Sequence, residues 1–247
     1  MFSEEENNTN IEVKENDIDI NKKHLSLRKL ILLFAIGFIG LFVVSFIIQL
    51  FLYFAPLDEV SKSAISNFVS YSVIFVSLIL VINFDIKLFK NDFKNWTSYL
   101  FGLSIAILLV VITISYTNFI NLFRTFKPSD NEEGLRKIVL AYPVLSILFF
   151  CFIGPMVEEL TYRVGLFNIF IKKKWLAYLI SIVIFALMHF RITSDDLIGE
   201  LINLPVYLIS GFALTLSYDK FGLGASLTAH ICNNLYAIVS FLIVSNL

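Results

Sequence analysis

The sequence predicts an all-α fold, a polytopic transmembrane helical bundle of about seven spans. Hydrophobic residues make up 57% of the 247 residues, against the roughly 45–50% that is usual in soluble domains. They gather in runs of about 20, the length a helix needs to cross a hydrocarbon core about 30 Å thick. The runs lack the alternation of a membrane barrel, and open strands would leave backbone groups unpaired in lipid. Helices are therefore the expected spanning structure.

The chain divides into a polar tail and two predicted membrane regions. Residues 1–26 are rich in Glu, Asn, Asp and Lys and contain no apolar stretch that could form the core of a signal peptide, so a cytoplasmic tail is expected. The N-terminal membrane helices are expected within 27–125 and the C-terminal membrane domain within 138–247. The predicted spans lie at about 26–54, 64–84, 97–120, 138–160, 174–190, 199–218 and 222–245.

Basic residues at the ends of membrane helices indicate which side faces the cytoplasm. Alternation along seven spans places Lys172 to Lys174 inside, but it puts the basic residues of 124–137 outside. A re-entrant or split span among the first three would remove that conflict, so six and eight spans are alternatives. The composition, rich in Phe, Ile, Asn and Lys, suggests an integral protein of a bacterial cell membrane. Four residues before the first span place the N-terminus inside: Lys22, Lys23, Arg28 and Lys29.

Charge and cysteine content exclude some classes of function. The net charge is −1 and the basic residues form no stripe that could hold a phosphate backbone, so no nucleic-acid partner is expected. The two cysteines, Cys151 and Cys232, lie inside apolar runs without the spacing of a zinc site or a disulfide framework. They are interpreted as small core residues.

Ionisable and amide side chains gather at three places in the apolar runs of the C-terminal half. A charged group at bilayer depth costs at least about 2.5–3.5 kcal/mol on insertion scales, so each one requires a partner or a function. The residues are Glu158, Glu159 and Arg163 at the end of the fourth span, His189 at the end of the fifth, and His230 and Asn234 in the seventh.

Helical spacing predicts how these residues pair. Glu159 and Arg163 are four residues apart and can form an ion pair, whereas Glu158 is turned about 100° away and lacks that partner. His230 and Asn234 are also four apart and project together. Taken singly, each group has a structural explanation, as an ion pair or an interhelical hydrogen bond. Taken together, they supply a base, proton carriers and an oxyanion donor, the set required for amide hydrolysis by water.

At these residues the sequence resembles the CAAX-protease and bacteriocin-processing family of intramembrane proteases. The resemblance covers about 140–240, and no motif of the family is found in the first three spans. One such motif is weak, but three in order on separate spans are specific. The motifs are Glu-Glu-x-x-x-Arg, matched by Glu158, Glu159 and Arg163; Phe-x-x-x-His, matched by Phe185 and His189; and His-x-x-x-Asn, matched by His230 and Asn234.

The resemblance implies a glutamate-type endopeptidase with its catalytic domain at 138–247. Glu158 and His189 would position and deprotonate a water molecule. His230 and Asn234 would stabilise the oxyanion of the tetrahedral intermediate. The carboxylate and guanidinium of the predicted ion pair would hold the site together or help to bind the peptide.

The expected substrate is a small peptide or a membrane-associated protein, which the enzyme would meet in the lipid bilayer. Bacteriocin immunity and the maturation of a signalling peptide are the processes that the resemblance suggests. The sequence indicates neither a cleavage site nor an oligomeric state.

Two alternatives stay open. No cofactor is expected, but a carboxylate and two imidazoles are acceptable zinc ligands, so Glu158, His189 and His230 are the candidate ligands if a metal is bound. HExxH is absent. The second alternative is a non-catalytic membrane scaffold, immunity factor or transporter, for which Asn203 beside Pro205 would be a broken-helix substrate site.

Overall fold

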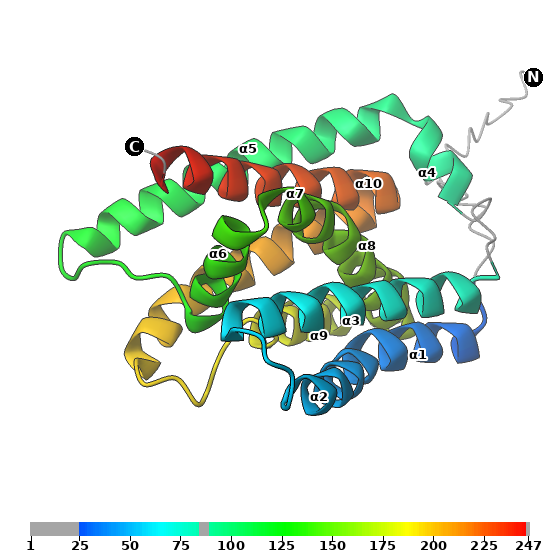
Figure 1. The fold of residues 1–247 in the computed structure, drawn as a ribbon. Helices are drawn as coiled ribbons and strands as arrows, with labels where there is room; N and C mark the ends of the chain where they lie inside the picture. The colour runs from blue at the N-terminus through cyan, green and yellow to red at the C-terminus, as the bar shows by residue number, and fades with distance from the viewer. Residues whose placement is uncertain (1–24, 84–88, 246–247) are drawn as a thin grey trace, which may run out of the picture.

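The computed structural model describes residues 25–83 and 89–245 (Figure 1). Within these ranges all regular secondary structure is helical, so the predicted all-α class is confirmed. The predicted tail lies outside the described residues except for its last two positions. The helices are α1 (Leu27–Ala35), α2 (Leu41–Leu52), α3 (Glu59–Val81), α4 (Lys90–Lys94), α5 (Trp96–Asn121), α6 (Asp130–Ala141), α7 (Pro143–Ser146), α8 (Gly154–Glu158), α9 (Lys174–Leu187) and α10 (Leu197–Ser245), with π-helical segments η1 (Ile36–Gly40), η3 (Ile147–Ile153) and η4 (Glu159–Phe167).

Five helical stretches of the described chain are long and apolar enough to cross a membrane. A sixth apolar helix, α9, has 14 residues, and the last stretch is interrupted at Gly222, where φ is 81°. Each of the seven predicted spans therefore has a helical counterpart, although two of them join as one interrupted helix. The five stretches are Leu27–Leu52, Glu59–Val81, Trp96–Asn121, Pro143–Phe167 and Leu197–Ser245.

The fourth predicted span, 138–160, needs a corrected start. The polar segment before it is not a loop but the helix α6, whose first N–H groups are capped by Ser129: its hydroxyl accepts from the N–H of Glu132 at 3.3 Å. Three acidic residues in the first turn complement the helix dipole. The chain then leaves helical geometry at Tyr142 and the membrane helix begins at Pro143, whose fixed φ suits the first turn.

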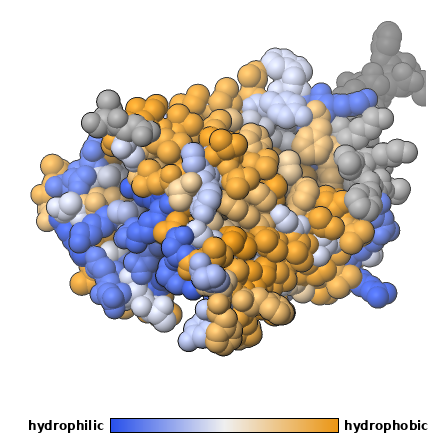
Figure 2. Space-filling model, viewed as in Figure 1, coloured by the Kyte–Doolittle hydropathy of each residue, from blue (hydrophilic) through white to orange (hydrophobic). Residues whose placement is uncertain are grey.

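The bundle brings the N-terminal helices against the C-terminal domain. Figure 1 shows α5 running beside α10 along one side, while α1, α2 and α3 lie on the other side of α8. Apolar side chains cover much of the visible face in Figure 2, and hydrophilic ones gather at its left end, around α6 and the connection after α5. This distribution matches an integral membrane protein whose polar connections lie at the ends of its helices.

Candidate active site

The two neighbouring glutamates lie where the α8 helix passes into the π-helical segment η4. Pro155 has no N–H to donate, and just before it the N–H of Gly154 bonds to the carbonyl of Phe149, five residues back. This bond closes the π-helical segment η3, which precedes α8. π-Helical turns are rare in proteins and frequent at functional sites. All nine residues of η4 are buried, so Glu159 and Arg163 lie in the protein interior rather than at a membrane surface.

Glu159 has three polar partners inside the bundle. Its Oε1 lies 3.3 Å from Nη1 of Arg163, the partner that helical spacing predicts, and 2.8 Å from Nδ1 of His230. The hydroxyl of Ser226 donates to its other oxygen, Oε2. The side chains of Glu159 and Arg163 are both completely buried, so this carboxylate is the counter-charge for a guanidinium that has lost its contact with water.

The guanidinium of Arg163 is held on its other side by α9 and α10. Its central carbon lies 4.5 Å from the ring centroid of Phe185, a cation–π contact. Its Nη2 donates to the carbonyl oxygen of Gly211 at 3.4 Å. The arginine thus ties η4 to α9, after whose end His189 follows, and to α10, which carries His230.

Glu158 is less buried than Glu159, and one of its carboxylate oxygens accepts no hydrogen bond in the described structure. Its side chain is 15% exposed, and its Oε1 accepts a hydrogen bond of 3.2 Å from the hydroxyl of Tyr71 on α3. Its Oε2 is buried and accepts no hydrogen bond in the described structure, but lies 3.7 Å from Nε2 of His230. One carboxylate oxygen is fixed by tyrosine, and the other faces an imidazole.

His230 therefore stands between the two glutamates. A carboxylate only accepts hydrogen bonds, so Nδ1, which is 2.8 Å from Glu159, must carry the proton of that contact. The opposite nitrogen, Nε2, is turned toward Glu158. A carboxylate that orients an imidazole in this way fixes both its tautomer and its ring position.

His189 is brought to the same region but not into direct contact with these glutamates. Its Nδ1 lies 2.9 Å from the carbonyl oxygen of Phe185, and its ring stacks on Tyr207 with centroids 4.7 Å apart. The ring of Phe185 contacts both imidazoles, at 4.9 Å from His189 and 6.0 Å from His230. Among the described residues, no hydrogen bond or ion pair joins His189 to Glu158.

Asn234 lies one turn beyond His230 and packs toward η3. Its Nδ2 donates to the carbonyl oxygen of Phe150 at 2.9 Å. That bond occupies one of the two amide hydrogens, and the other remains for a further acceptor. The helix that carries His230 is thus bonded to both π-helical segments, to η3 through Phe150 and to η4 through Glu159.

The candidate metal ligands do not converge. In the described part of the chain no group of three His, Cys, Asp or Glu side chains is arranged to hold a metal ion. Glu158 and His230 approach each other, whereas among the described residues no hydrogen bond or ion pair joins His189 to either of them. The predicted trio therefore does not fit a zinc site in this arrangement, and no step below uses a metal.

Asn203, which the transporter alternative would place at a substrate site, has a structural role. The amide of Asn203 donates to the carbonyl oxygens of Lys127 at 3.0 Å and Gly199 at 2.8 Å. It fastens the connection after α5 to the first turns of α10. Both hydrogens of the amide are thereby bonded to backbone, and α10 continues as a helix through Pro205.

Two residues of the site were not singled out by sequence reasoning. Ser226 precedes His230 by four residues, so helical spacing could have placed it on the same face. Tyr71 has no local signal, because it stands in an apolar span of the N-terminal half and meets Glu158 only through packing.

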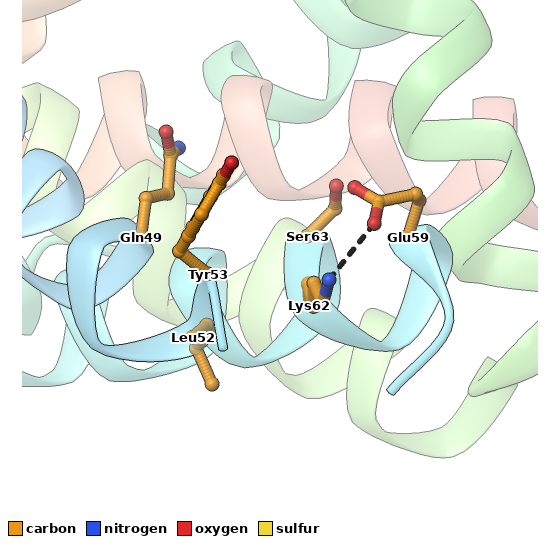
Figure 3. Close-up of a pocket in the computed structure, with 6 residues that line it drawn as sticks. All are labelled: Gln49, Leu52, Tyr53, Glu59, Lys62 and Ser63. Carbon is orange, nitrogen blue, oxygen red and sulfur yellow. Dashed lines mark hydrogen bonds and ion pairs between the residues drawn. The ribbon is translucent and has the colours of Figure 1, made fainter. Parts of the chain in front are cut away.

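A separate pocket of about 340 Å³ lies where α2 turns into α3. Figure 3 shows that polar and apolar side chains line it, among them Lys62 and Glu59, whose ion pair is 3.0 Å long. None of its lining residues belongs to the site around Glu158. They are Gln49, Leu52, Tyr53, Glu59, Lys62 and Ser63.

Comparison with known proteins gives a family match in the C-terminal half. Residues 140–236 match the family model described as type II CAAX prenyl endopeptidase, Rce1-like. The predicted family resemblance is confirmed. All six predicted site residues lie inside the matched region, whereas Tyr71 lies outside it. The Rce1-like match and the apolar helices together describe an integral membrane protein related to endopeptidases.

Three bacterial relatives are also similar. An uncharacterized protein of Mycoplasma capricolum is 29% identical over 171 residues, which cover 64% of this chain and 48% of that protein. The UPF0177 proteins YvdC and YxdF of Lactococcus lactis are 27% and 29% identical, each over 58% of this chain, and over 52% and 77% of their own lengths. The chain thus spans about half the length of the first two relatives. No solved structure matches it.

Proposed function

We propose that the protein is an intramembrane endopeptidase that cleaves a small peptide or a membrane-associated protein with a water molecule activated by Glu158. The observation that carries the proposal is the pairing of Oε2 of Glu158 with Nε2 of His230, 3.7 Å apart. Two polar atoms at this separation can both contact one water molecule at normal hydrogen-bond distances. The Rce1-like match supports the reaction class.

In the proposed reaction, Glu158 is the general base. Its Oε2 takes a proton from the water as the water oxygen attacks the carbonyl carbon of the scissile peptide bond. The tetrahedral intermediate carries the negative charge on the former carbonyl oxygen. The proton then passes from Glu158 to the amide nitrogen as the C–N bond breaks, which leaves a carboxyl group and an amine. Tyr71 holds the other carboxylate oxygen, so the base presents a fixed face.

The remaining residues orient the water and stabilise the intermediate. Because Nδ1 of His189 faces a carbonyl oxygen, its neutral ring has a lone pair on Nε2 that can accept from the water. His230, fixed by Glu159, donates from Nε2 to the oxyanion when it is protonated at both nitrogens. The second amide hydrogen of Asn234 is a further donor. These roles extend those implied by the family motifs.

The cellular setting that we propose is supported by the organisms of the relatives, and the kind of substrate by the family resemblance. The relatives come from bacteria, which supports a bacterial cell membrane, with the N-terminus on the cytoplasmic side from the charge distribution. In that setting the substrate would be a bacteriocin-like or signalling peptide, cleaved for immunity or for maturation.

Comparative peptidomics tests the proposal. Peptides of membranes and medium are compared between cells with the wild-type protein and cells with Glu158→Gln at equal membrane level. We expect a defined set of cleavage products to be missing from the variant and their precursors to accumulate. Identical peptidomes at equal protein level would contradict the proposed function.

A further inference from the structure

The helix that carries Ser226 and His230 begins at a break in α10. Gly222 has φ 81° and ψ −173°, a backbone conformation that only glycine adopts without strain. After the break, residues 223–245 form a new helix, whose first N–H groups have no partner within the helix. Partners from elsewhere in the chain must satisfy them, and these partners fix where the helix starts.

Asp92 of the short helix α4 supplies such a partner. Its Oδ2 accepts from the N–H of Leu223 at 3.1 Å. The carboxylate also lies directly on Gly222, because a Cβ added to that glycine would be only 2.5 Å from the carboxyl carbon of Asp92. A carboxylate at the start of a helix is favoured by the helix dipole as well as by the hydrogen bond.

The first turn of α5 holds the other side of the break. The hydroxyl of Ser98 donates to the carbonyl oxygen of Phe221 at 3.0 Å. The rings of Phe101 and Phe221 stack with centroids 4.0 Å apart. The last carbonyl and side chain before the break are therefore bound to α5, while the first N–H after it is bound to α4.

Close packing continues this contact toward His230. A Cβ added to Gly102 would lie 2.5 Å from the carbonyl oxygen of Ala225 and 2.8 Å from Cβ of Thr228, so only glycine lets α5 approach this far. The contact reaches Ala229, the residue before His230, whose backbone N is 3.2 Å from the same added Cβ. The first two turns of the helix are thus locked against α5.

We propose that Asp92 is a positioning residue for His230. Together with Ser98 and Gly102 it forms a clamp, which we call the α4–α5 clamp, that sets the axial position and rotation of the helix beginning at Leu223. Leu223 and His230 are seven residues apart, about two turns, so a shift at the start of the helix is passed to the imidazole. Such a shift would change the 2.8 Å contact between Nδ1 of His230 and Oε1 of Glu159.

The α4–α5 clamp gives the N-terminal half a role at the site, although no motif of the family is found in that half. All three clamp residues lie before the region that matches the Rce1-like model. The importance of the clamp for catalysis rests on the proposed function, but its effect on the geometry of His230 does not.

The test observes His230 directly. The full-length protein is labelled with ¹⁵N-histidine in detergent micelles, and its three histidines are assigned with single His→Gln variants. Spectra and melting temperatures are recorded for Asp92→Ala, for Asp92→Asn, which retains a side-chain oxygen for the N–H of Leu223, and for the matched surface control Lys94→Ala.

We expect the Nδ1 signal of His230 to shift toward that of an imidazole without a carboxylate partner in Asp92→Ala. Asp92→Asn should restore most of the wild-type position, and Lys94→Ala should not change it. If Asp92→Ala yields no folded protein, Ser98→Ala takes its place and should shift the same signal. An unshifted His230 signal in a folded Ala variant, with only a lower melting temperature, would show that Asp92 merely stabilises the fold and would overturn the proposal. None of these outcomes depends on peptide cleavage.

Discussion

Glu159 and His230 are 71 residues apart in the chain and meet inside the bundle with Oε1 and Nδ1 2.8 Å apart. Because the carboxylate accepts from Nδ1, the second ring nitrogen is turned toward Glu158. The two neighbouring glutamates thus have different tasks: Glu159 orients an imidazole and balances Arg163, while Glu158 keeps an oxygen without a hydrogen bond.

Replacing Glu158 by Gln should abolish turnover while the protein still folds. The amide keeps the shape of the side chain but cannot accept a proton from water, and general-base catalysis typically contributes about 10²–10⁴-fold. The measurement is peptide cleavage beside detergent-purified yield and melting temperature. Near-normal cleavage by Glu158→Gln, or a loss fully explained by misfolding, would show that Glu158 is not the base.

Replacing Tyr71 by Phe should lower kcat with little change in KM, and it should also lower the melting temperature because the same hydrogen bond contributes to stability. The ring is retained, so packing on α3 is preserved, but one oxygen of Glu158 loses its fixed partner. A hydrogen bond to a charged group contributes about 1.5–3 kcal/mol, which corresponds to a decrease of about 10-fold or more. Ser77→Ala, which removes an exposed hydroxyl bonded to Val73 on the same helix, is the matched control. An unchanged kcat in Tyr71→Phe would mean that the hydroxyl does not hold the base.

Replacing Glu159 by Gln should lower stability as well as activity. Arg163 is completely buried, and removal of its counter-charge leaves a cation without compensation, which costs about 3–5 kcal/mol in comparable buried pairs. Ser226→Ala removes a neutral partner from the same carboxylate and should cost less, about 1–3 kcal/mol. The melting temperatures of the two variants, measured in the same detergent, show which substitution lowers stability more. Equal stability of Glu159→Gln and wild type would contradict the assigned role of the carboxylate.

Cleavage should persist after exhaustive chelation of metals. The three candidate ligands do not converge on one point, and the proposed roles of Glu158 and His230 need only water. The assay compares chelated and untreated protein and measures the metal content of both. A stoichiometric metal whose removal abolishes cleavage, and whose return restores it, would favour zinc-type chemistry instead.

The stabilising effect of Asp196 should disappear in acid. The N–H of Gly199 and the guanidinium of Arg124 bond to its carboxylate, and these bonds lower its pKa below the usual 3.8. A carboxyl group whose pKa is lower in the folded state stabilises that state above the unfolded pKa and loses this effect as the pH falls through the folded value. Asp196→Asn should therefore melt earlier than wild type at pH 7, and the difference should vanish at low pH. A difference that does not depend on pH would exclude the charge as its cause.

Local patterns in the sequence were sufficient to predict the helical spans and one of the ion pairs of the C-terminal half. Runs of apolar residues must become helices in lipid, because no other open structure satisfies the backbone there, and each predicted span has a helical counterpart. Spacing by four residues correctly placed Glu159 beside Arg163. By contrast, the fourth span was predicted to start at residue 138, but that position belongs to the separate helix α6, whose initiation is favoured by Ser129 and three acidic residues.

Contacts between distant segments were decided by the tertiary structure alone. The hydrogen bond from Tyr71 to Glu158 joins residues 87 positions apart, and the cap from Asp92 to Leu223 joins residues 131 apart, distances over which helical periodicity carries no information. The direction of His230 depends on which carboxylate reaches its Nδ1, and that depends on the packing of α10 against η4. The sequence alone determined which ionisable and amide groups lie in the apolar spans, because such residues stand out in an apolar run and their insertion into lipid costs free energy. Only the folded bundle decided which of them touch.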